Sequence, residues 1–400
     1  MFAPIDGANC PSAVGDDGDD PGPYSLLLSR GVFRIYLPVP DGAEFTVRVV
    51  SDAAGCNVNP KYNHTVDRTG HKTRILSVYR RPKVAANLRF TTTTLANTDP
   101  AGYAFDPYTG APLPVDANGV VESGNIMWDG REPTLYSQAI NATLIHAEAL
   151  TPPTPAQVRQ IVSFESQLFS AQATLNGAGS LDELGAQGGP EYLAATPAAG
   201  VNSVTDPNYV PMTLVDAWGA LIGSSRADKL RESIYRGEQI FNNTPFTISN
   251  VPGFNDVPPV NNSFNGGCAF CHSQANAGTD VFPRSQQDIG TTGTSVAFGG
   301  PAPAKDLPVF ELSCQGGAST PYAGSVVRTT DPGLALITGK CADIGKVTVS
   351  SLRGLASRAP YFHDGSAATL LDVVNFYDRR FSIGLSAQDK TDLVNFLNAL

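Results

Sequence analysis

Apolar and polar positions along the chain predict two short strands followed by amphipathic helices. Residues 32–36 and 45–49 are rich in β-branched and aromatic residues, which is typical of strands. Apolar residues do not recur at a regular spacing over 51–133, so this segment is predicted to be mostly irregular. Helices are predicted over 135–150 and from 155 to about 175, where apolar residues recur at helical spacing.

The second half of the chain shows clearer helix signals. A Gly-, Pro- and Ala-rich stretch over 176–211 is predicted to connect two halves, and a helix is predicted over 225–243. Its apolar face contains Leu230, Ile234, Gly237 and Phe241. Capping boxes at Thr369-x-x-Asp372 and Ser386-x-x-Asp389 predict where the last two helices begin.

Composition sets limits on the class of protein. With 400 residues, of which 42% are hydrophobic, the chain can bury a sizeable core and is too long for one small domain. No run approaches the ~18 apolar residues of a membrane helix, which excludes an integral helical membrane protein. The net charge of −10 argues against a nucleic-acid or anionic-membrane partner. Residues 1–23 are expected to form a flexible, acidic lead-in.

The main chemical signal is Cys268-Ala-Phe-Cys271-His272. Cys-x-x-Cys-His is the attachment motif of c-type haem: two thiols form thioethers with the porphyrin, and the imidazole binds the iron. A thioredoxin-like redox pair would need a βαβ context, but Gly266-Gly267 and an Asn-rich loop precede the motif. A structural zinc site would need a second pair of ligands. The haem interpretation is therefore favoured.

The remaining cysteines are Cys10, Cys56, Cys314 and Cys341. Covalent haem implies an exported, periplasmic-type protein, in which disulfides persist. Three pairings are open, and we favour Cys10–Cys56 with Cys314–Cys341. The first residues do not read as a cleavable signal peptide, so we expect that it was removed before this numbering begins.

The second axial ligand of the iron is a separate question. The three methionines are Met1, Met127 and Met212, and none follows the Cys-x-x-Cys-His motif. The usual His/Met arrangement is therefore not expected. His363, Tyr377, other tyrosines or an open position remain as alternatives.

Two further motifs carry a family resemblance. Residues 359–377, which begin Ala-Pro-Tyr-Phe-His-Asp-Gly-Ser, resemble the C-terminal haem domain of the bacterial di-haem cytochrome c peroxidase/MauG superfamily. Met127-Trp-Asp-Gly-Arg131 resembles its N-terminal domain. The resemblance covers roughly residues 50–400. It implies a mainly α fold, with a cytochrome c-like haem domain over 201–400 and a degenerate cytochrome c-like domain over 24–200 with some β-strand and long loops.

The resemblance also implies roles for single residues near the haem. Tyr377 lies fourteen places after His363, where peroxidases have an axial methionine and MauG-type members a tyrosine. It is therefore implied as an iron ligand beside His272, with a core tyrosine as the alternative. His363 matches a family histidine that could hold a propionate or a water; the alternative is a hydrogen-bonded histidine in a turn.

The family's N-terminal haem motif is degenerate in this chain. The corresponding segment is Cys56-Asn-Val-Asn59-Pro60, in which the second cysteine and the histidine are replaced. We expect one haem c, with Cys56 in a disulfide. Attachment through Cys56 alone, with His64 or His71 as ligand, is the alternative.

Two residues match family positions near the N-terminal haem, although the haem motif itself is replaced. Trp128 matches a tryptophan between the two haems, as either a redox relay or a packing residue. Glu148 matches the acid/base glutamate, but without nearby iron a surface or helix-capping role is favoured. The family calcium site uses an asparagine where this chain has Arg80 or Arg81, which argues against calcium.

Three functions remain open on these grounds. The first is a peroxidase-like oxidoreductase with one haem, the second a pure electron-transfer cytochrome, and the third a haem-bearing structural or sensing module. Loss of the second haem motif favours electron transfer, whereas loss of the axial methionine favours ligand chemistry. We expect a haem c redox protein of this superfamily, with a redox partner protein or a small electron donor or acceptor.

Overall fold

The computed structural model describes residues 25–66, 69–94, 115–117, 119–147, 149–198, 209–257, 260, 262–293, 304–319 and 321–400. The predicted acidic lead-in and Glu148 lie outside the described residues. So does the stretch 199–208, which contains the predicted domain boundary near residue 200.

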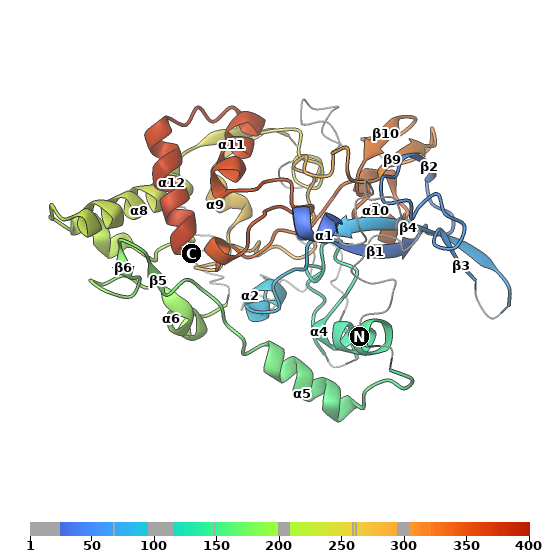
Figure 1. Ribbon diagram of the computed structural model, residues 1–400, viewed down its shortest axis with the longest axis horizontal. Coiled ribbons are helices and arrows are strands. Elements are labelled where there is room, and N and C mark those ends of the chain that lie inside the picture. Colours follow the sequence, from blue (N-terminus) through green and yellow to red (C-terminus); the bar gives the residue numbers. More distant parts are fainter. Residues whose placement is uncertain are drawn as a thin grey trace.

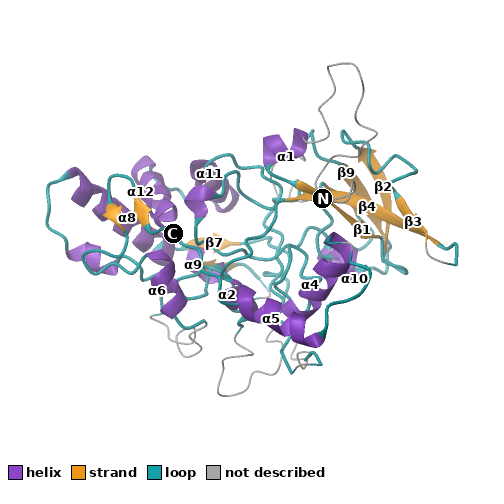
Figure 2. Ribbon diagram, turned by 60° about the horizontal axis from the view of Figure 1, so that its bottom comes forward, coloured by secondary structure: helices purple, strands orange, loops and turns teal. Residues whose placement is uncertain are grey.

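The longest helices of the C-terminal half and the two three-stranded sheets occupy opposite ends of the molecule (Figure 1). One end contains the helices α8 (Arg226–Asn243), α9 (Cys268–Cys271), α11 (Leu370–Phe381) and α12 (Ala387–Ala399). Small sheets form the other end, and long loops run between the two (Figure 2). The predicted combination of helices, some strand and long loops is confirmed, whereas the cytochrome c-like topology stays a prediction. Within the described ranges, no helix is long and apolar enough to cross a bilayer.

Apart from the strands of the two larger sheets, the other elements are short. They are α1 (Ser25–Arg30), α2 (Leu88–Thr92), α4 (Leu135–Asn141), η2 (Ala142–His146), α5 (Pro155–Glu165), β5 (Thr174–Leu175), β6 (Gly179–Ser180), α6 (Gly189–Ala195), η3 (Asp216–Ala220), β7 (Phe246–Ile248), β8 (Phe264–Gly266), α10 (Ala335–Thr338), η5 (Cys341–Asp343) and η6 (Leu355–Ser357).

The predicted starts of the last helices are confirmed. The Thr369 hydroxyl accepts from the Asp372 amide of α11, and the Ser386 hydroxyl accepts from the Asp389 amide of α12, both at 3.1 Å. Each aspartate in turn accepts from the backbone amide of its capping residue. These reciprocal bonds satisfy amides that the first turn of a helix leaves unpaired, so the local sequence alone sets where both helices begin.

The α8 helix lies unusually close to α12. A Cβ atom at Gly237 would stand 2.1 Å from the carbonyl oxygen of Asp392, so only glycine permits this approach. Asp392 is buried at the crossing, where its carboxylate accepts from the Arg236 guanidinium at 2.8 Å. The predicted apolar face of α8 is buried here as well, with Ile234 and Phe241 in the core.

Two predicted helices are shorter than expected. The helix predicted over 135–150 is α4 followed by one π-helical turn, η2. The helix predicted to run from 155 to about 175 ends at Glu165. Beyond it, Asn87 exchanges two hydrogen bonds with the backbone of Ser170, at 2.8 and 3.0 Å. These long-range bonds take the backbone groups that a longer helix would use.

The prediction that residues 51–133 are mostly irregular missed two strands in the first part of this segment. β3 (His64–Val66) and β4 (Lys72–Arg80) lie in this segment, and β4 is the central strand of the sheet β1-β4-β3, with β1 at Phe33–Pro38. The last six residues of β4 are all buried, so polar and apolar residues do not alternate along it. The stretch 176–211, predicted as a connection, contains β6 and α6, with Leu181 and Leu193 fully buried.

A second sheet joins segments that are far apart in the sequence. Its order is β10-β9-β2, in which β2 (Phe45–Ser51) pairs antiparallel with β9 (Val309–Cys314), and β10 spans Val326–Thr329. The predicted disulfide Cys314–Cys341 forms at the end of β9. Cys56 is also disulfide-bonded, and Cys10, its predicted partner, lies outside the described residues.

A buried guanidinium connects three segments next to this sheet. Arg80, the last residue of β4, donates to both carboxylate oxygens of Asp331 at 2.6 and 2.8 Å, and also to Asp129. Arg131 donates to Asp129 from the other side at 2.8 Å. Arg80, Asp129 and Asp331 are almost fully buried. Burial is the largest single influence and would raise the pKa of both carboxyl groups. The charge of Arg80 and its hydrogen bonds, together with the other neighbouring donors, outweigh burial, so that both pKa values are lowered.

Replacing Arg80 by methionine is predicted to destabilise the fold by about 3–5 kcal/mol, because two carboxylates lose a buried partner. Both pKa values are lowered in the folded state. The stabilisation is therefore complete above the ordinary aspartate pKa of about 4 and is lost as the pH falls through the lowered values. Urea unfolding at pH 7 and at acid pH measures the difference, which should shrink in acid.

The matched control is Arg48→Met, which removes an exposed pair with Glu311 and should cost at most about 1 kcal/mol. Equal stability losses for Arg80→Met and Arg48→Met at pH 7 would contradict the role given to Arg80.

Candidate functional site

The helical end of the molecule encloses a cavity of about 260 Å³. Most of its wall is apolar and comes from α8, α11, α12 and the loop 347–352. The apolar lining includes Ile240, Phe241, Val349, Leu352, Val373, Val374, Leu393 and Leu397. An apolar pocket with a few convergent polar groups is the usual form of a cofactor or ligand site.

Cys268, Cys271 and His272 all line this cavity. The two cysteines begin and end α9, one helical turn apart, and neither is in a disulfide. A half-buried thiol that faces an apolar cavity suits a thioether bond to a porphyrin. The sequence predicted that these three residues act together, and the structure places them on one wall.

The His272 ring is held in a defined tautomer. Its Nδ1 lies 2.6 Å from the carbonyl oxygen of Gly278, which can only accept, so Nδ1 carries the proton and Nε2 has a free lone pair. Burial lowers the pKa of His272, although the bond to Gly278 opposes this. The imidazole is therefore neutral near pH 7, the state in which it binds a metal.

The chemistry of the two thiols fits haem attachment better than the other two interpretations. Burial raises the pKa of Cys268 to about 12, and burial together with Asp280 raises the pKa of Cys271. A thioredoxin-like pair needs a lowered pKa instead. In the described part of the chain, no three His, Cys, Asp or Glu side chains gather as a metal-binding group, which leaves a zinc site without ligands there.

Tyr377, on α11, also lines the cavity. Its ring lies among aromatic neighbours, with centroid distances of 5.4 Å to Phe376 and 6.2 Å to Phe381. Burial and the two nearby cysteine thiols raise its pKa. Among the described residues, its hydroxyl makes no hydrogen bond, so the phenol oxygen is available to a bound group.

His363 lies in the same cavity wall and is 1% exposed. Neither ring nitrogen has a hydrogen-bond partner among the described residues, and Nε2 is 3.8 Å from a carboxylate oxygen of Asp331. The alternative of a hydrogen-bonded histidine in a turn is therefore wrong for its side chain. Burying an imidazole without hydrogen-bond partners costs free energy. This indicates that a bound group or a water forms hydrogen bonds with its ring nitrogens.

Trp128 is the next predicted residue on this wall. Its indole Nε1 donates to the carbonyl oxygen of Arg81 at 2.6 Å, and its ring meets the ring of His363 edge-on at 6.0 Å. The ammonium of Lys83 lies 5.4 Å from the centre of the indole ring. Burial lowers the pKa of Lys83 to about 7, against the opposing charge of Asp129. Trp128 is thus half-buried and in contact with the cavity.

The other expectations concern residues away from the cavity. Glu148 lies outside the described residues. Met127 and Met212 are not among the residues that line the cavity. Arg80, one of the two arginines that argued against the family calcium site, pairs with Asp129 and Asp331. Paired carboxylates do not offer the free oxygen ligands that calcium takes, so these residues do not fit calcium.

Sequence reasoning missed two basic residues of the wall, Lys83 and Arg358, and assigned Arg81 only to the calcium question. One signal was present for Arg358, which directly precedes the Ala359-Pro-Tyr-Phe-His motif. Lys83 had no such signal, because the strand that brings it to the cavity was not predicted.

Parts of this chain are similar to known proteins. No protein-family model matches the chain. Cytochrome-c peroxidase IdrP1 of Pseudomonas sp. (strain SCT) is 32% identical over 155 residues, which are 34% of this chain and 38% of the relative. Cytochrome-c peroxidase IdrP2 of Denitromonas iodatirespirans is 41% identical over 78 residues, or 18% of this chain and 21% of the relative.

Among solved structures, a MauG-like protein associated with microbial copper homeostasis aligns with 84% of this chain and 78% of its own. The TM-score is 0.34 and the sequence identity 19%, values too low to establish a shared fold.

The curated relatives confirm the resemblance to the bacterial di-haem cytochrome c peroxidase/MauG superfamily. This class consists of haem-dependent redox proteins. The chain spans well under half the length of the relatives it matches, 38% and 21% of them, so the activity of the whole relatives does not transfer with the resemblance.

Proposed function

We propose that the protein is an exported c-type haem redox protein that holds one covalent haem in this cavity and acts as a peroxidase-like oxidoreductase. The supporting observation is that a single apolar cavity gathers the whole Cys268–His272 motif together with Tyr377, His363 and Trp128. These residues come from three separate parts of the chain, around positions 128, 268–272 and 363–377.

Each residue of the motif has a distinct role in the proposal. Cys268 and Cys271 form the two thioether bonds, and His272 offers Nε2 to the iron because Gly278 holds the proton on Nδ1. When bound, haem c supplies one-electron redox chemistry at iron. The apolar side chains around it exclude water, which strengthens electrostatic interactions inside the cavity.

Tyr377 is the proposed second ligand to the metal. Its hydroxyl has no hydrogen-bond partner among the described residues, and it lines the same cavity as His272. A phenol in an apolar site keeps its proton until a cation approaches, as the raised pKa indicates. A tyrosinate oxygen favours ferric iron and a low potential, which suits oxidative chemistry better than simple electron relay.

His363 and Trp128 would serve the cavity in other ways. His363 has two buried ring nitrogens free to hold a carboxylate or a water. The Trp128 indole contacts the Lys83 ammonium and the His363 ring on the cavity wall, and we infer that it is the redox relay of the site. Glu148 is retained only as a sequence-based candidate for acid/base chemistry.

A pure electron-transfer function is the second candidate, and one observation favours it. A sulfur in a disulfide cannot form a thioether, so Cys56 leaves no second haem attachment in the segment where the family has one. The disulfide Cys314–Cys341 supports export to an oxidising compartment. In either function, the electrons come from or go to a redox partner protein or a small donor or acceptor.

Haem attachment is the first test. Protein matured in a host with a c-type haem assembly system should contain one haem per chain, measured by the pyridine haemochrome spectrum and by intact mass. Changing Cys268 and Cys271 together to serine should abolish covalent haem. His64→Ala and His71→Ala are the controls and should leave the haem content unchanged. Full haem content without both cysteines, or loss of haem in a control, would contradict the assignment.

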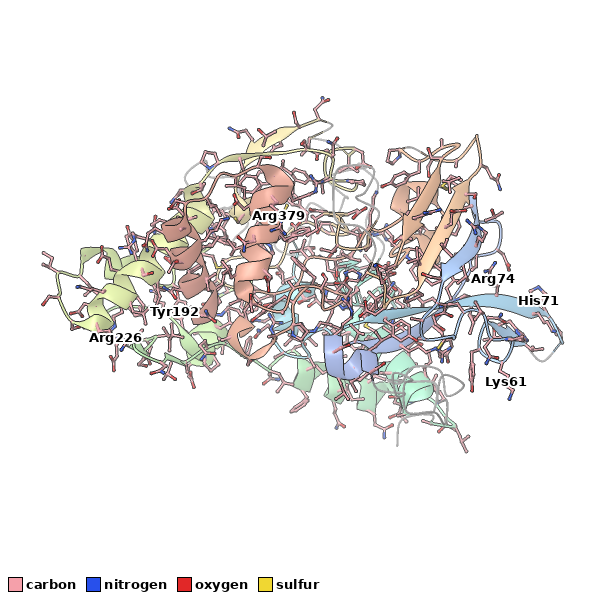
Figure 3. All side chains as sticks on the ribbon, turned by 45° about the horizontal axis from the view of Figure 1, so that its top comes forward. Lys61, His71, Arg74, Tyr192, Arg226 and Arg379 are labelled. Carbon is pink, nitrogen blue, oxygen red and sulfur yellow. A yellow bond between two sulfur atoms is a disulfide. The ribbon has the colours of Figure 1, made fainter. Side chains whose placement is uncertain are left out.

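Replacing Tyr377 by phenylalanine tests the second ligand. If the phenol oxygen binds the iron, the Soret and near-infrared bands of the ferric protein should shift, and the midpoint potential should rise because an anionic ligand is removed. Tyr192→Phe is the control, on α6 and away from the cavity (Figure 3). An unchanged ferric spectrum would remove Tyr377 from the coordination sphere.

Peroxide turnover separates the two candidate functions. A peroxidase-like enzyme should oxidise a reduced dye or a reduced cytochrome with peroxide at least about tenfold faster than free haem at equal concentration. A rate no higher than that of free haem, together with a low-spin ferric iron, would support electron transfer and overturn the enzymatic function. Holoprotein inactivated by prior cyanide binding gives the background rate.

A further inference from the structure

Two arginines face the cavity and have no carboxylate partner in the part of the chain that the structure describes. Arg81 and Arg358 both line it, and the Nε atom of each is buried without a hydrogen-bond partner among the described residues. Arg358 uses one terminal nitrogen to donate to the carbonyl oxygen of Ser351 at 2.7 Å. A guanidinium has five donors, so most of those on both side chains are left over for another acceptor.

The neighbouring basic groups differ in this respect. Arg80, one residue before Arg81, is matched by two aspartates. The Lys83 ammonium donates hydrogen bonds to the hydroxyl of Thr348 at 2.7 Å and to the carbonyl oxygens of Asn125 and Met127 at 3.1 and 3.5 Å. Among the basic groups of the described cavity wall, Arg81 and Arg358 are thus incompletely paired, as is the buried imidazole of His363.

The two guanidinium groups also repel each other. Burial, and then the charge of Arg81, lowers the pKa of Arg358 to about 10, and burial lowers the pKa of Arg81. Two like charges at the edge of an apolar cavity are costly unless an anion neutralises them.

Both arginines have fixed backbones. The Arg81 amide donates to the carbonyl oxygen of His363 at 2.6 Å, and its own carbonyl accepts from Trp128. The Arg358 amide donates to the carbonyl oxygen of Leu355 at 2.9 Å. The charges are thus presented to the cavity by a rigid wall, which lowers the entropy lost when an anion binds.

We propose that Arg81 and Arg358 form a dicarboxylate-binding end of the cavity that holds the two propionate groups of haem c. This assignment rests on the proposed function, because it requires the porphyrin to occupy the cavity. The match is chemical: haem has one apolar ring system and two carboxylates, and the cavity has apolar walls and two unmatched guanidinium groups. Arginine binds carboxylates with two parallel hydrogen bonds, which lysine cannot do.

The test uses holoprotein with the haem already attached, and the variants Arg81→Gln, Arg358→Gln and the double variant. Arg379→Gln is the control for net charge, since Arg379 is exposed on α11 (Figure 3). Loss of a cation near the iron should favour the ferric state, so the ratio of ferrous to ferric protein at a fixed potential should fall roughly tenfold at pH 8 in the double variant. The potential should also become pH-dependent between pH 5 and 8, because a propionate without a guanidinium partner takes up a proton in that range.

Resonance Raman spectra separate contact from long-range charge. The propionate bending bands should shift in both glutamine variants and stay unchanged in Arg379→Gln. Arg81→Lys and Arg358→Lys keep the charge, so they should retain most of the potential while still shifting the bands. These conservative variants also provide the readout if the double glutamine variant does not mature.

The outcomes distinguish the two proposals. A haem-containing double variant with the wild-type potential, pH profile and propionate bands would overturn the dicarboxylate site and leave the proposed function intact. Shifted potentials with unchanged bands would overturn it as well, because the charges would then act without contact. Wild-type protein that acquires no covalent haem would overturn the proposed function itself.

Discussion

The arrangement of the cavity depends on the buried guanidinium of Arg80. It holds β4, the Trp-Asp-Gly-Arg segment and the segment around Asp331 together through two carboxylates that have no access to water. The next residue, Arg81, then ties Trp128 and His363 to the same wall through its backbone. Because unpaired buried charges are so costly, this cluster defines one arrangement of three distant segments and, with it, one wall of the cavity.

The part of the cavity wall formed by α8, α11 and α12 is positioned by close packing. Gly237 lets α8 approach α12, and α11 packs beside them, so that Phe241 and Tyr377 face the same space as the cysteine motif. The guanidinium groups of Arg81 and Arg358, which have no carboxylate partner among the described residues, also line the cavity, so that it combines apolar and cationic side chains. An amphipathic cofactor with two carboxylates matches this combination.

In the N-terminal half, two positions that the family resemblance singled out form links within the chain. Cys56 is buried and disulfide-bonded, and Arg80, at the position that argued against the family calcium site, pairs with Asp129 and Asp331. The Trp-Asp-Gly-Arg segment has a structural role, since Asp129 pairs with Arg80 and Trp128 lines the cavity.

The sequence by itself determined the features that depend on local chemistry. These are the Cys268–His272 motif, the capped starts of α11 and α12, and the replacement of the second haem motif, because spacing and side-chain type suffice for them. Only the tertiary structure decided which charges are paired. Arg80 and Arg81 are adjacent and alike in sequence, yet one lies between two aspartates and the other faces the cavity. β4 was missed for a related reason: burial on both faces removes the alternation by which a strand is recognised, and its neighbours come from distant parts of the chain.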